Sequence, residues 1–281
     1  MRSQQRSFLG CCLANNRMYE FVLKHKRTLY IRVNQENGRN TVNNNLQKKR
    51  LAKLAGLALT TSLFSSIAAA EVSGEIALTN DYRFRGVSQT AGDFAVQGGI
   101  DWSFESGFSV GAWASNLDFD EPDYNGPDIE FDFYAAYGGE INDNLSYDVT
   151  LYRYNYSGES DLGYFEVTAG VEFSGFRVAY WFTNDYGGSD LDYHYGEINY
   201  SYEFVENWSL DLHYGYNVGD ALDDGEGFDS YSDYSVGVST ELMGFGLSLA
   251  WLGTDLSGDQ KVSDGVFQND DTVLARVSYA F

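Results

Sequence analysis

The sequence predicts that residues 71–281 form an all-β domain: a transmembrane, antiparallel, up-and-down β-barrel of about 12 strands. Three observations predict this fold. Apolar and polar residues alternate with period two in one segment after another, as they do in strands with one apolar face. Short turns alternate with long polar loops along the chain. The final segment, 272–281, is amphipathic and ends in Phe281, which resembles the closing strand of Gram-negative outer-membrane barrels.

Charge and cysteine divide the chain into two parts. Residues 1–70 hold 12 basic and 2 acidic residues, so 71–281 hold 6 of the 18 basic and 39 of the 41 acidic residues, a formal charge of −33. This excludes nucleic acid as a partner of the second part, because phosphate binding needs a basic surface. Both cysteines, Cys11 and Cys12, lie in the first part, so disulfides and thiolate chemistry are not expected in the second.

Residues 48–70 have the pattern of a secretory signal peptide. Residues 48–53 are mostly basic, 54–67 are apolar, and three alanines follow, so we expect cleavage after Ala70. The alternative, a membrane anchor, is disfavoured because the apolar run is too short to span well. Residues 1–47 form a basic leader with no expected structure. Either the basic region of the signal peptide is unusually long or translation starts downstream, and we favour the second.

Twelve segments of residues 71–281 alternate, and no run there approaches the 18 apolar residues of a transmembrane helix. The expected strands are 72–84, 94–104, 108–114, 129–140, 145–152, 165–173, 176–183, 197–204, 208–217, 233–241, 245–251 and 272–281. Five connections are tight: 105–107, 141–144, 174–175, 205–207 and 242–244. The six between them are longer and polar: about 85–92, 117–128, 157–163, 184–192, 218–230 and 254–271. Such sorting is typical of outer-membrane barrels, with short periplasmic turns and long extracellular loops, whereas a soluble β-sandwich has no reason for it.

Aromatic residues gather near the strand ends on the apolar face, where two interfacial girdles are expected. They are Tyr82, Phe84, Trp102, Phe104, Phe108, Phe173, Phe176, Phe204, Trp208, Phe245, Trp251 and Phe281. Four other aromatics, Trp113, Tyr134, Tyr152 and Trp181, have the parity of the inner face and would narrow the lumen.

Residues 80–90, Asn-Asp-Tyr-Arg-Phe-Arg-Gly-Val-Ser-Gln-Thr, carry a resemblance to a known family. The chain from residue 72 to Phe281 resembles the Gcw_chp family, whose members are also called TorF-family porins. The resemblance implies an outer-membrane barrel with a channel role and no established substrate. One departure is Arg276, which stands where many barrels have Gly five residues before the final aromatic. We expect Arg276 in the lumen near Asp81 and Arg83.

The faces opposite the apolar ones are strongly acidic. The expected pore-lining residues are Glu75, Asp81, Arg83, Asp101, Glu130, Asp132, Asp148, Glu166, Glu172, Arg177, Glu197, Glu203, Asp211, Glu241 and Arg276, with Glu140 on the same face. Bare carboxylates in a dry core are costly, so this face predicts a solvated lumen, and acidic pores favour cations. Twelve strands leave room for either a narrow passage or a plugged interior.

We therefore expect an outer-membrane porin, not an enzyme: a passive, cation-preferring diffusion channel for small cationic or neutral solutes. Its expected partners are outer-membrane lipid, lipopolysaccharide and, through the strand ending in Phe281, the barrel-assembly machinery. The first alternative is a non-conducting structural or adhesin-type barrel. The second is an outer-membrane lipid hydrolase, for which residues 71–281 offer only His194 and His213 and no serine motif.

Acidic residues cluster in three of the long loops: Asp118, Asp120, Glu121, Asp123 and Asp128; Asp220, Asp223, Asp224, Glu226 and Asp229; Asp255, Asp259, Asp264, Asp270 and Asp271. Such oxygens suit Ca²⁺ or Mg²⁺, but none of the clusters has the EF-hand spacing. We expect no cofactor, and we favour solvated loops bridged to lipopolysaccharide by divalent ions over a dedicated metal site.

Overall fold

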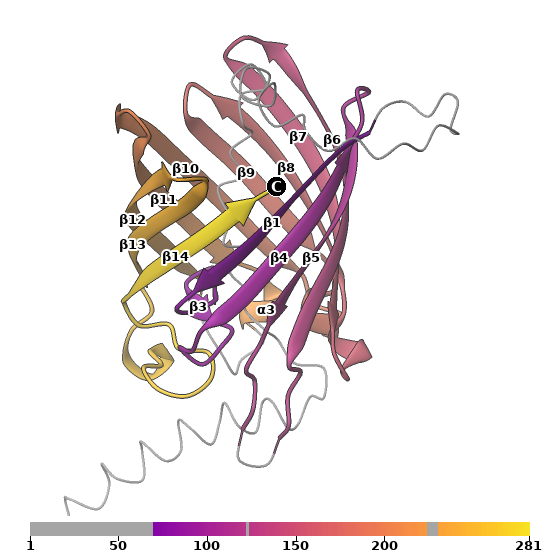
Figure 1. Ribbon diagram of the computed structural model, residues 1–281. Coiled ribbons are helices and arrows are strands. Elements are labelled where there is room, and N and C mark those ends of the chain that lie inside the picture. The colour runs from indigo at the N-terminus through magenta and orange to yellow at the C-terminus, as the bar shows by residue number, and fades with distance from the viewer. Residues whose placement is uncertain (1–69, 122–123, 224–229) are drawn as a thin grey trace, which may run out of the picture.

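The computed structural model describes residues 70–121, 124–223 and 230–281, and the expected leader 1–47 and nearly all of the expected signal peptide 48–70 lie outside this part of the chain. Twelve antiparallel strands close into one barrel (Figure 1). They are β1 (Glu71–Thr79), β4 (Ala95–Ser103), β5 (Phe108–Asn116), β6 (Ile129–Asn142), β7 (Leu145–Tyr156), β8 (Phe165–Phe173), β9 (Phe176–Thr183), β10 (Tyr193–Val205), β11 (Trp208–Val218), β12 (Tyr231–Leu242), β13 (Phe245–Thr254) and β14 (Thr272–Ala280). The prediction of a twelve-stranded barrel is confirmed.

The connections sort to the two ends as predicted. We call the end with the two- to four-residue links, such as Ser174–Gly175 between β8 and β9, the turn end. We call the other the loop end. It carries the short helices η2 (Ser160–Leu162), η3 (Tyr186–Gly188), α3 (Asp220–Asp223) and η4 (Gly258–Gln260). In Figure 1 the loop end is at the bottom and the C-terminus lies near the turn end. Among the residues that the structure places, no helix is long and apolar enough to cross a membrane.

The barrel closes where β1 meets β14. Five residue pairs, from Glu75–Ala280 to Thr79–Arg276, align the two strands antiparallel. Beyond the end of β14, Phe281 and Gly74 exchange both backbone hydrogen bonds, at N···O distances of 2.8 and 2.9 Å. The expected pairing of the last strand with the first is therefore confirmed, and the terminal residue takes part in it.

The two faces of the wall differ as the alternation requires. Large apolar side chains such as Ile76, Val96, Phe133 and Val178 point outward and are about half or more exposed. Their neighbours in sequence point inward and are buried or only partly exposed. An exposed apolar surface running around a closed sheet is what hydrocarbon requires, since closure leaves no backbone edge unpaired.

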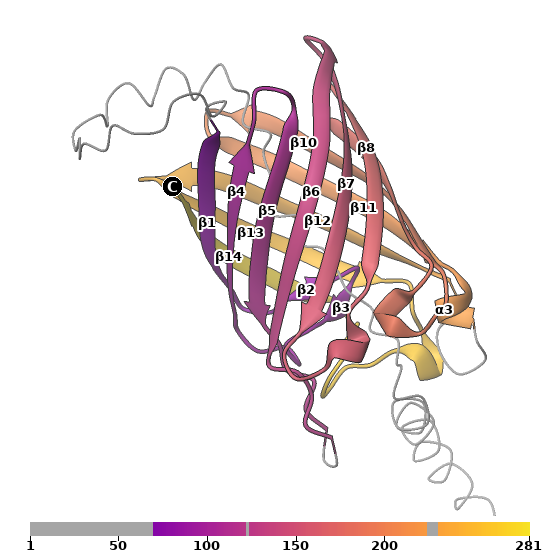
Figure 2. The ribbon, with the colours of Figure 1, turned by 90° about the vertical axis from the view of Figure 1, so that its right-hand side faces the viewer.

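The first strand ends earlier than the alternation predicts. The expected strand 72–84 stops at Thr79, and the chain then folds into the lumen as a small hairpin of β2 (Arg83–Phe84) and β3 (Val87–Ser88). Figure 2 shows β2 and β3 inside the wall at the loop end. Tyr82 and Phe84 were expected on the lipid-facing girdle, which is wrong, because both are buried inside the barrel.

Local chemistry explains why the hairpin forms. Its tip is Arg85-Gly86, and both residues have positive φ, 48° and 84°, as the mirror-image turns of two-residue hairpins require. Asp81 fixes the base: its carboxylate accepts hydrogen bonds from Arg83 Nε at 2.5 Å, Ser88 Oγ at 2.6 Å and Thr90 Oγ1 at 3.1 Å. A strand continued to Phe84 would lose these bonds.

Candidate functional site: the lumen and its inward hairpin

The inner wall near the turn end is polar and partly exposed. Arg177 on β9 donates to Asp148 on β7 at 2.5 and 3.2 Å, and Glu172 lies directly across from Arg177 on β8. Arg276 on β14 pairs with Glu75 on β1, across the closing seam. Both ion pairs join strands along the inner wall, and their side chains are partly exposed to solvent. Each therefore contributes little to the stability of the fold.

Other inward carboxylates on this half accept hydrogen bonds from neutral groups. Asp211 accepts from Ser201 Oγ at 2.7 Å and Ser239 Oγ at 2.6 Å, and Asp101 accepts from Tyr134 Oη at 2.5 Å. Glu203, Glu241 and Glu140 lie exposed where the strands end. Carboxylates therefore share the inner face of the turn-end half with hydroxyl groups that donate to them.

Two inward-facing glycines make room for these contacts. Tyr134 reaches Asp101 by lying across Gly111 of β5, where a Cβ would sit 2.3 Å from the tyrosine ring. Arg177 reaches Asp148 by lying across Gly170 of β8, where a Cβ would sit 2.7 Å from its Nη2. Inner-wall glycines therefore allow side chains to bridge strands that are not neighbours.

Nearer the loop end, the inward acids are buried. Glu130 and Asp132 on β6 are covered, and Glu130 accepts from Tyr82 Oη of the hairpin segment at 3.3 Å. Glu197 on β10 accepts from the Trp181 indole at 3.0 Å. Glu166 on β8 accepts from Tyr154 Oη at 2.9 Å.

Asp81 and Arg83 do not lie on the barrel wall. They belong to the inward segment, where Arg83 donates to the carbonyl oxygens of Gly86, Gln268 and Asp270 at 3.2, 2.9 and 3.2 Å. Arg83 thereby ties the hairpin to the loop between β13 and β14. Arg276 was expected near Asp81 and Arg83; it lies across from Thr79, where β1 ends, and its ion pair is with Glu75.

Arg85, at the hairpin tip, is enclosed by aromatic rings and one carboxylate. Its Cζ lies 4.4 Å from the ring centroid of Tyr195, 4.9 Å from Tyr193, 4.7 Å from Phe84 and 5.7 Å from Trp181. Its Nη2 lies 2.9 Å from Glu166 Oε1, and both side chains are 1% exposed or less. We call Phe84, Glu166, Trp181, Tyr193 and Tyr195 the Arg85 cage.

Two further observations concern Arg85: the pKa of its side chain and a hydrogen bond to its backbone carbonyl. Burial disfavours its charge, but attraction by Glu166 and the surrounding tyrosines outweighs this, and the pKa of Arg85 lies well above its usual value. Tyr231 Oη donates to the backbone carbonyl of Arg85 at 3.0 Å, which holds the tip in place.

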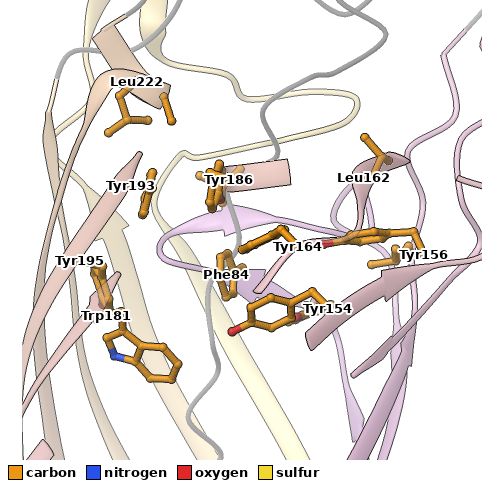
Figure 3. Packing of buried hydrophobic residues seen from close by; sticks show 14 of the residues in the cluster. Phe84, Tyr154, Tyr156, Leu162, Tyr164, Trp181, Tyr186, Tyr193, Tyr195 and Leu222 are labelled. Carbon is orange, nitrogen blue, oxygen red and sulfur yellow. The ribbon is translucent and has the colours of Figure 1, made fainter. Parts of the chain in front are cut away.

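A larger aromatic cluster surrounds the cage and fills the loop end of the lumen. Figure 3 shows Phe84 between Tyr154 and Tyr164 on one side and Trp181 and Tyr195 on the other. Members of this cluster come from the hairpin, β4, β7, β9, β10, α3, β12 and the long loops. We call the hairpin together with this cluster the plug. The inward aromatics Trp113, Tyr134, Tyr152 and Trp181 continue it along the wall through edge and tilted ring contacts at 5.4–5.5 Å.

Sequence reasoning missed several members of this site. Arg85 was expected in a long outer loop. The signal that could have found it is Arg85-Gly86, a polar residue followed by glycine, which is typical of a two-residue hairpin turn. It stands between two short segments that each alternate polar and apolar residues, Arg83–Phe84 and Val87–Ser88. Tyr154, Tyr193 and Tyr195 have the inner-face parity of their strands, which marks aromatics that cannot belong to a lipid girdle. Asp233 was also missed; it accepts from Asn217 Nδ2 at 2.8 Å and lies 2.7 Å from His213 Nε2.

The two histidines lie on opposite faces of the wall. His213 is inside, next to Asn199 and Asp233. His194 lies on the outer face of β10, with Nε2 2.7 Å from Asp192 and Nδ1 2.5 Å from Tyr180 Oη. Their neighbours are tyrosine, amide and carboxylate groups.

The acidic loops are only partly within the structure. Asp123, Asp224, Glu226 and Asp229 lie outside the described residues, and the side chain of Asp223 is likewise not described. Within 70–121, 124–223 and 230–281, no group of three or more His, Cys, Asp or Glu side chains is arranged to hold a metal ion.

Comparison with solved structures finds bacterial porins. The KdgM porin in complex with disordered oligogalacturonate matches with a TM-score of 0.47 at 10% identity, over 75% of this chain and 98% of the porin. The NanC porin matches with a TM-score of 0.48 at 6% identity, over 75% and 98%. The outer membrane channel DcaP of Acinetobacter baumannii matches with a TM-score of 0.35 at 10% identity, over 78% and 99%. At these identities the likeness concerns the fold alone.

In sequence, no curated protein matches this chain. A family model described as "Bacterial protein of unknown function (Gcw_chp)" matches residues 65–281, which include every strand of the barrel. The inward hairpin, which contains most of the motif on which the resemblance was based, lies within this match. The chain belongs to the Gcw_chp family.

Proposed function

We propose that this protein is a passive channel of the bacterial outer membrane that favours small cations and neutral solutes over anions. The observation that carries the proposal is the set of carboxylates on the inner face of the turn-end half. They outnumber the guanidiniums there, and Asp101 and Asp211 accept hydrogen bonds from tyrosine and serine hydroxyls. Rings of carboxylates attract cations and repel anions in a narrow pore.

The location follows from the outer surface of the barrel. An apolar outer face around a closed sheet needs lipid, and barrels of this kind insert in the bacterial outer membrane. In this orientation the turn end faces the periplasm, and the loop end, with the plug, faces lipopolysaccharide and the cell exterior. The strand that ends in Phe281 is the segment offered to the assembly machinery.

The plug supports a refinement of the channel proposal. Solutes would meet an open, acidic vestibule from the turn end and a closed aromatic barrier at the loop end. Passage therefore requires the hairpin to leave its position in the lumen.

A second candidate function is favoured by the plug itself. If the hairpin never leaves, the protein is a non-conducting structural or adhesin-type barrel, and its function lies in the long loops. The lipid-hydrolase alternative gains no support from the outward His194, whose hydrogen-bond partners Tyr180 and Asp192 provide no serine nucleophile.

A liposome-swelling assay with the purified barrel tests the channel proposal. Lysine, arabinose and glutamate provide a cation, a neutral solute and an anion of comparable size. We expect swelling to be fastest with lysine and slowest with glutamate. In a double variant, Asp101→Asn with Asp211→Asn, the lysine and glutamate rates should differ less. Absence of swelling with all three solutes would favour the structural barrel, and fastest swelling with glutamate would contradict the acidic-lumen argument.

A further inference from the structure

The position of Arg85 is unusual for a purely structural arginine. It is a non-glycine residue with positive φ at the tip of a hairpin, and its side chain points away from solvent into the barrel. Its backbone is that of an ordinary two-residue turn, because Ser174-Gly175 and Met243-Gly244 have the same pair of positive φ angles. What sets Arg85 apart is its side chain, which is buried in the Arg85 cage while Tyr231 holds its carbonyl.

The cage has the composition of a cation-recognition site. Ring faces of Phe84, Trp181, Tyr193 and Tyr195 lie within 4.4–5.7 Å of the guanidinium carbon, the range in which ring quadrupoles attract cations. A planar guanidinium stacks on such faces and is less strongly hydrated than an ammonium. Three of these rings, with Glu166, belong to the barrel wall and not to the hairpin, so they remain in place if the hairpin leaves.

Arg85 does not satisfy this site completely. Glu166 takes Nη2, but Nε and Nη1 are buried, and no carboxylate or carbonyl oxygen among the residues that the structure describes pairs with them. Buried donors that are incompletely hydrogen-bonded disfavour the arrangement that contains them. A free guanidinium is not tethered to a backbone turn and can rotate to suit the Glu166 carboxylate.

We propose that the Arg85 cage is the solute-recognition site of the channel, that it takes guanidinium-bearing cations, and that Arg85 occupies it as a tethered stand-in when no solute is bound. This deepens the proposed function by naming the class of solute, and it rests on the proposal that the protein is a channel. The acidic vestibule on the turn-end side leads a cation toward the cage, and a bound solute displaces Arg85 and with it the hairpin.

The test is binding of methylguanidinium chloride to the full chain in detergent micelles, measured by isothermal titration calorimetry. The Arg85→Ala variant vacates the cage, so we expect one methylguanidinium to bind per chain. Urea, a neutral molecule of nearly the same shape, should not bind. Removing the carboxylate in the double variant Arg85→Ala, Glu166→Gln should weaken methylguanidinium binding by at least about tenfold, the factor for about 1.4 kcal/mol.

A second measurement keeps Arg85 and serves if the alanine variant does not fold. A Val87→Cys reporter on β3, in a chain with Cys11 and Cys12 changed to serine, reacts with a maleimide only when the hairpin opens, since Val87 is 1% exposed. We expect methylguanidinium to raise the labelling rate and urea at the same concentration to leave it unchanged.

Three results would overturn the proposal: no methylguanidinium binding to the folded Arg85→Ala variant, equal binding of urea, or equal binding after loss of Glu166. An unchanged labelling rate in the Val87→Cys chain would also contradict it. None of these readouts depends on conductance. The swelling assay could therefore show no channel activity although the cage binds methylguanidinium, or show channel activity although the cage does not bind it.

Discussion

The packing of Gly86 gives the sharpest prediction about the plug. A Cβ on Gly86 would sit 2.3 Å from Thr254 Cγ2 and 3.1 Å from Asp233 Cβ, and the residue has a φ of +84°. An L side chain in this conformation costs about 1–2 kcal/mol, and forcing a methyl group into a packed site costs about 1–3 kcal/mol more. We therefore expect Gly86→Ala to destabilise the closed hairpin by roughly 2–5 kcal/mol.

Two variants separate the backbone cost from the clash. Gly158 has a φ of +75° with nothing within 4 Å of its added Cβ, so Gly158→Ala isolates the backbone cost. Thr254→Ser removes the clashing methyl but keeps the hydroxyl that donates to Asn269 O at 2.9 Å. Adding it to Gly86→Ala should therefore recover the part of the loss that comes from the clash with Thr254 and leave the backbone cost.

The assay is maleimide labelling of the Val87→Cys reporter chain. Gly86→Ala should accelerate labelling by at least about tenfold, Gly158→Ala should not, and adding Thr254→Ser to Gly86→Ala should reduce the acceleration. Equal labelling rates for Gly86→Ala and Gly158→Ala would refute the packing argument, and so would a Thr254→Ser double variant that labels as fast as Gly86→Ala alone.

Three further predictions concern the wall. Glu75→Gln removes the ion pair with Arg276 at the closing seam, where both groups are partly exposed. We therefore expect the free energy of unfolding in urea to fall by at most about 1 kcal/mol relative to a Glu71→Gln control. A much larger loss would contradict a partly exposed pair. Deletion of Phe281 removes its two backbone hydrogen bonds to Gly74 and should lower the folded fraction in lipid vesicles, whereas Phe281→Tyr should not; equal yields would count against a role for the terminus in closure. Asp148→Asn should lower the preference for potassium over chloride and Arg177→Gln should raise it, as measured by reversal potentials in a conducting background; shifts of the same sign would refute the assignment of this pair to the ion path.

The strands could be predicted because the information for them is local. Alternation with period two depends only on which neighbours meet lipid, and the tight turns are short enough to read directly, as at Ser174–Gly175. The number of strands, their order and the closure of β14 on β1 follow from this pattern.

The plug could not be predicted in the same way. Tyr82 and Phe84 continue the parity of Ile76 and Leu78, so alternation alone extends the first strand through them. What decides against this is a set of long-range contacts, including Arg83 with the carbonyls of Gln268 and Asp270, that the local pattern does not contain. Parity assigned the carboxylates to the inner face, but it does not show which part of the lumen the hairpin occupies.

The central claim is that Arg85 and its hairpin close a cation-selective lumen. Single-channel recording of the wild-type chain and Arg85→Ala side by side, in a potassium chloride gradient, tests it most directly. The account predicts a mostly closed wild-type chain and an open Arg85→Ala variant whose reversal potential shows preference for potassium. Equal currents in the two chains, or a reversal potential that shows preference for chloride, would contradict it.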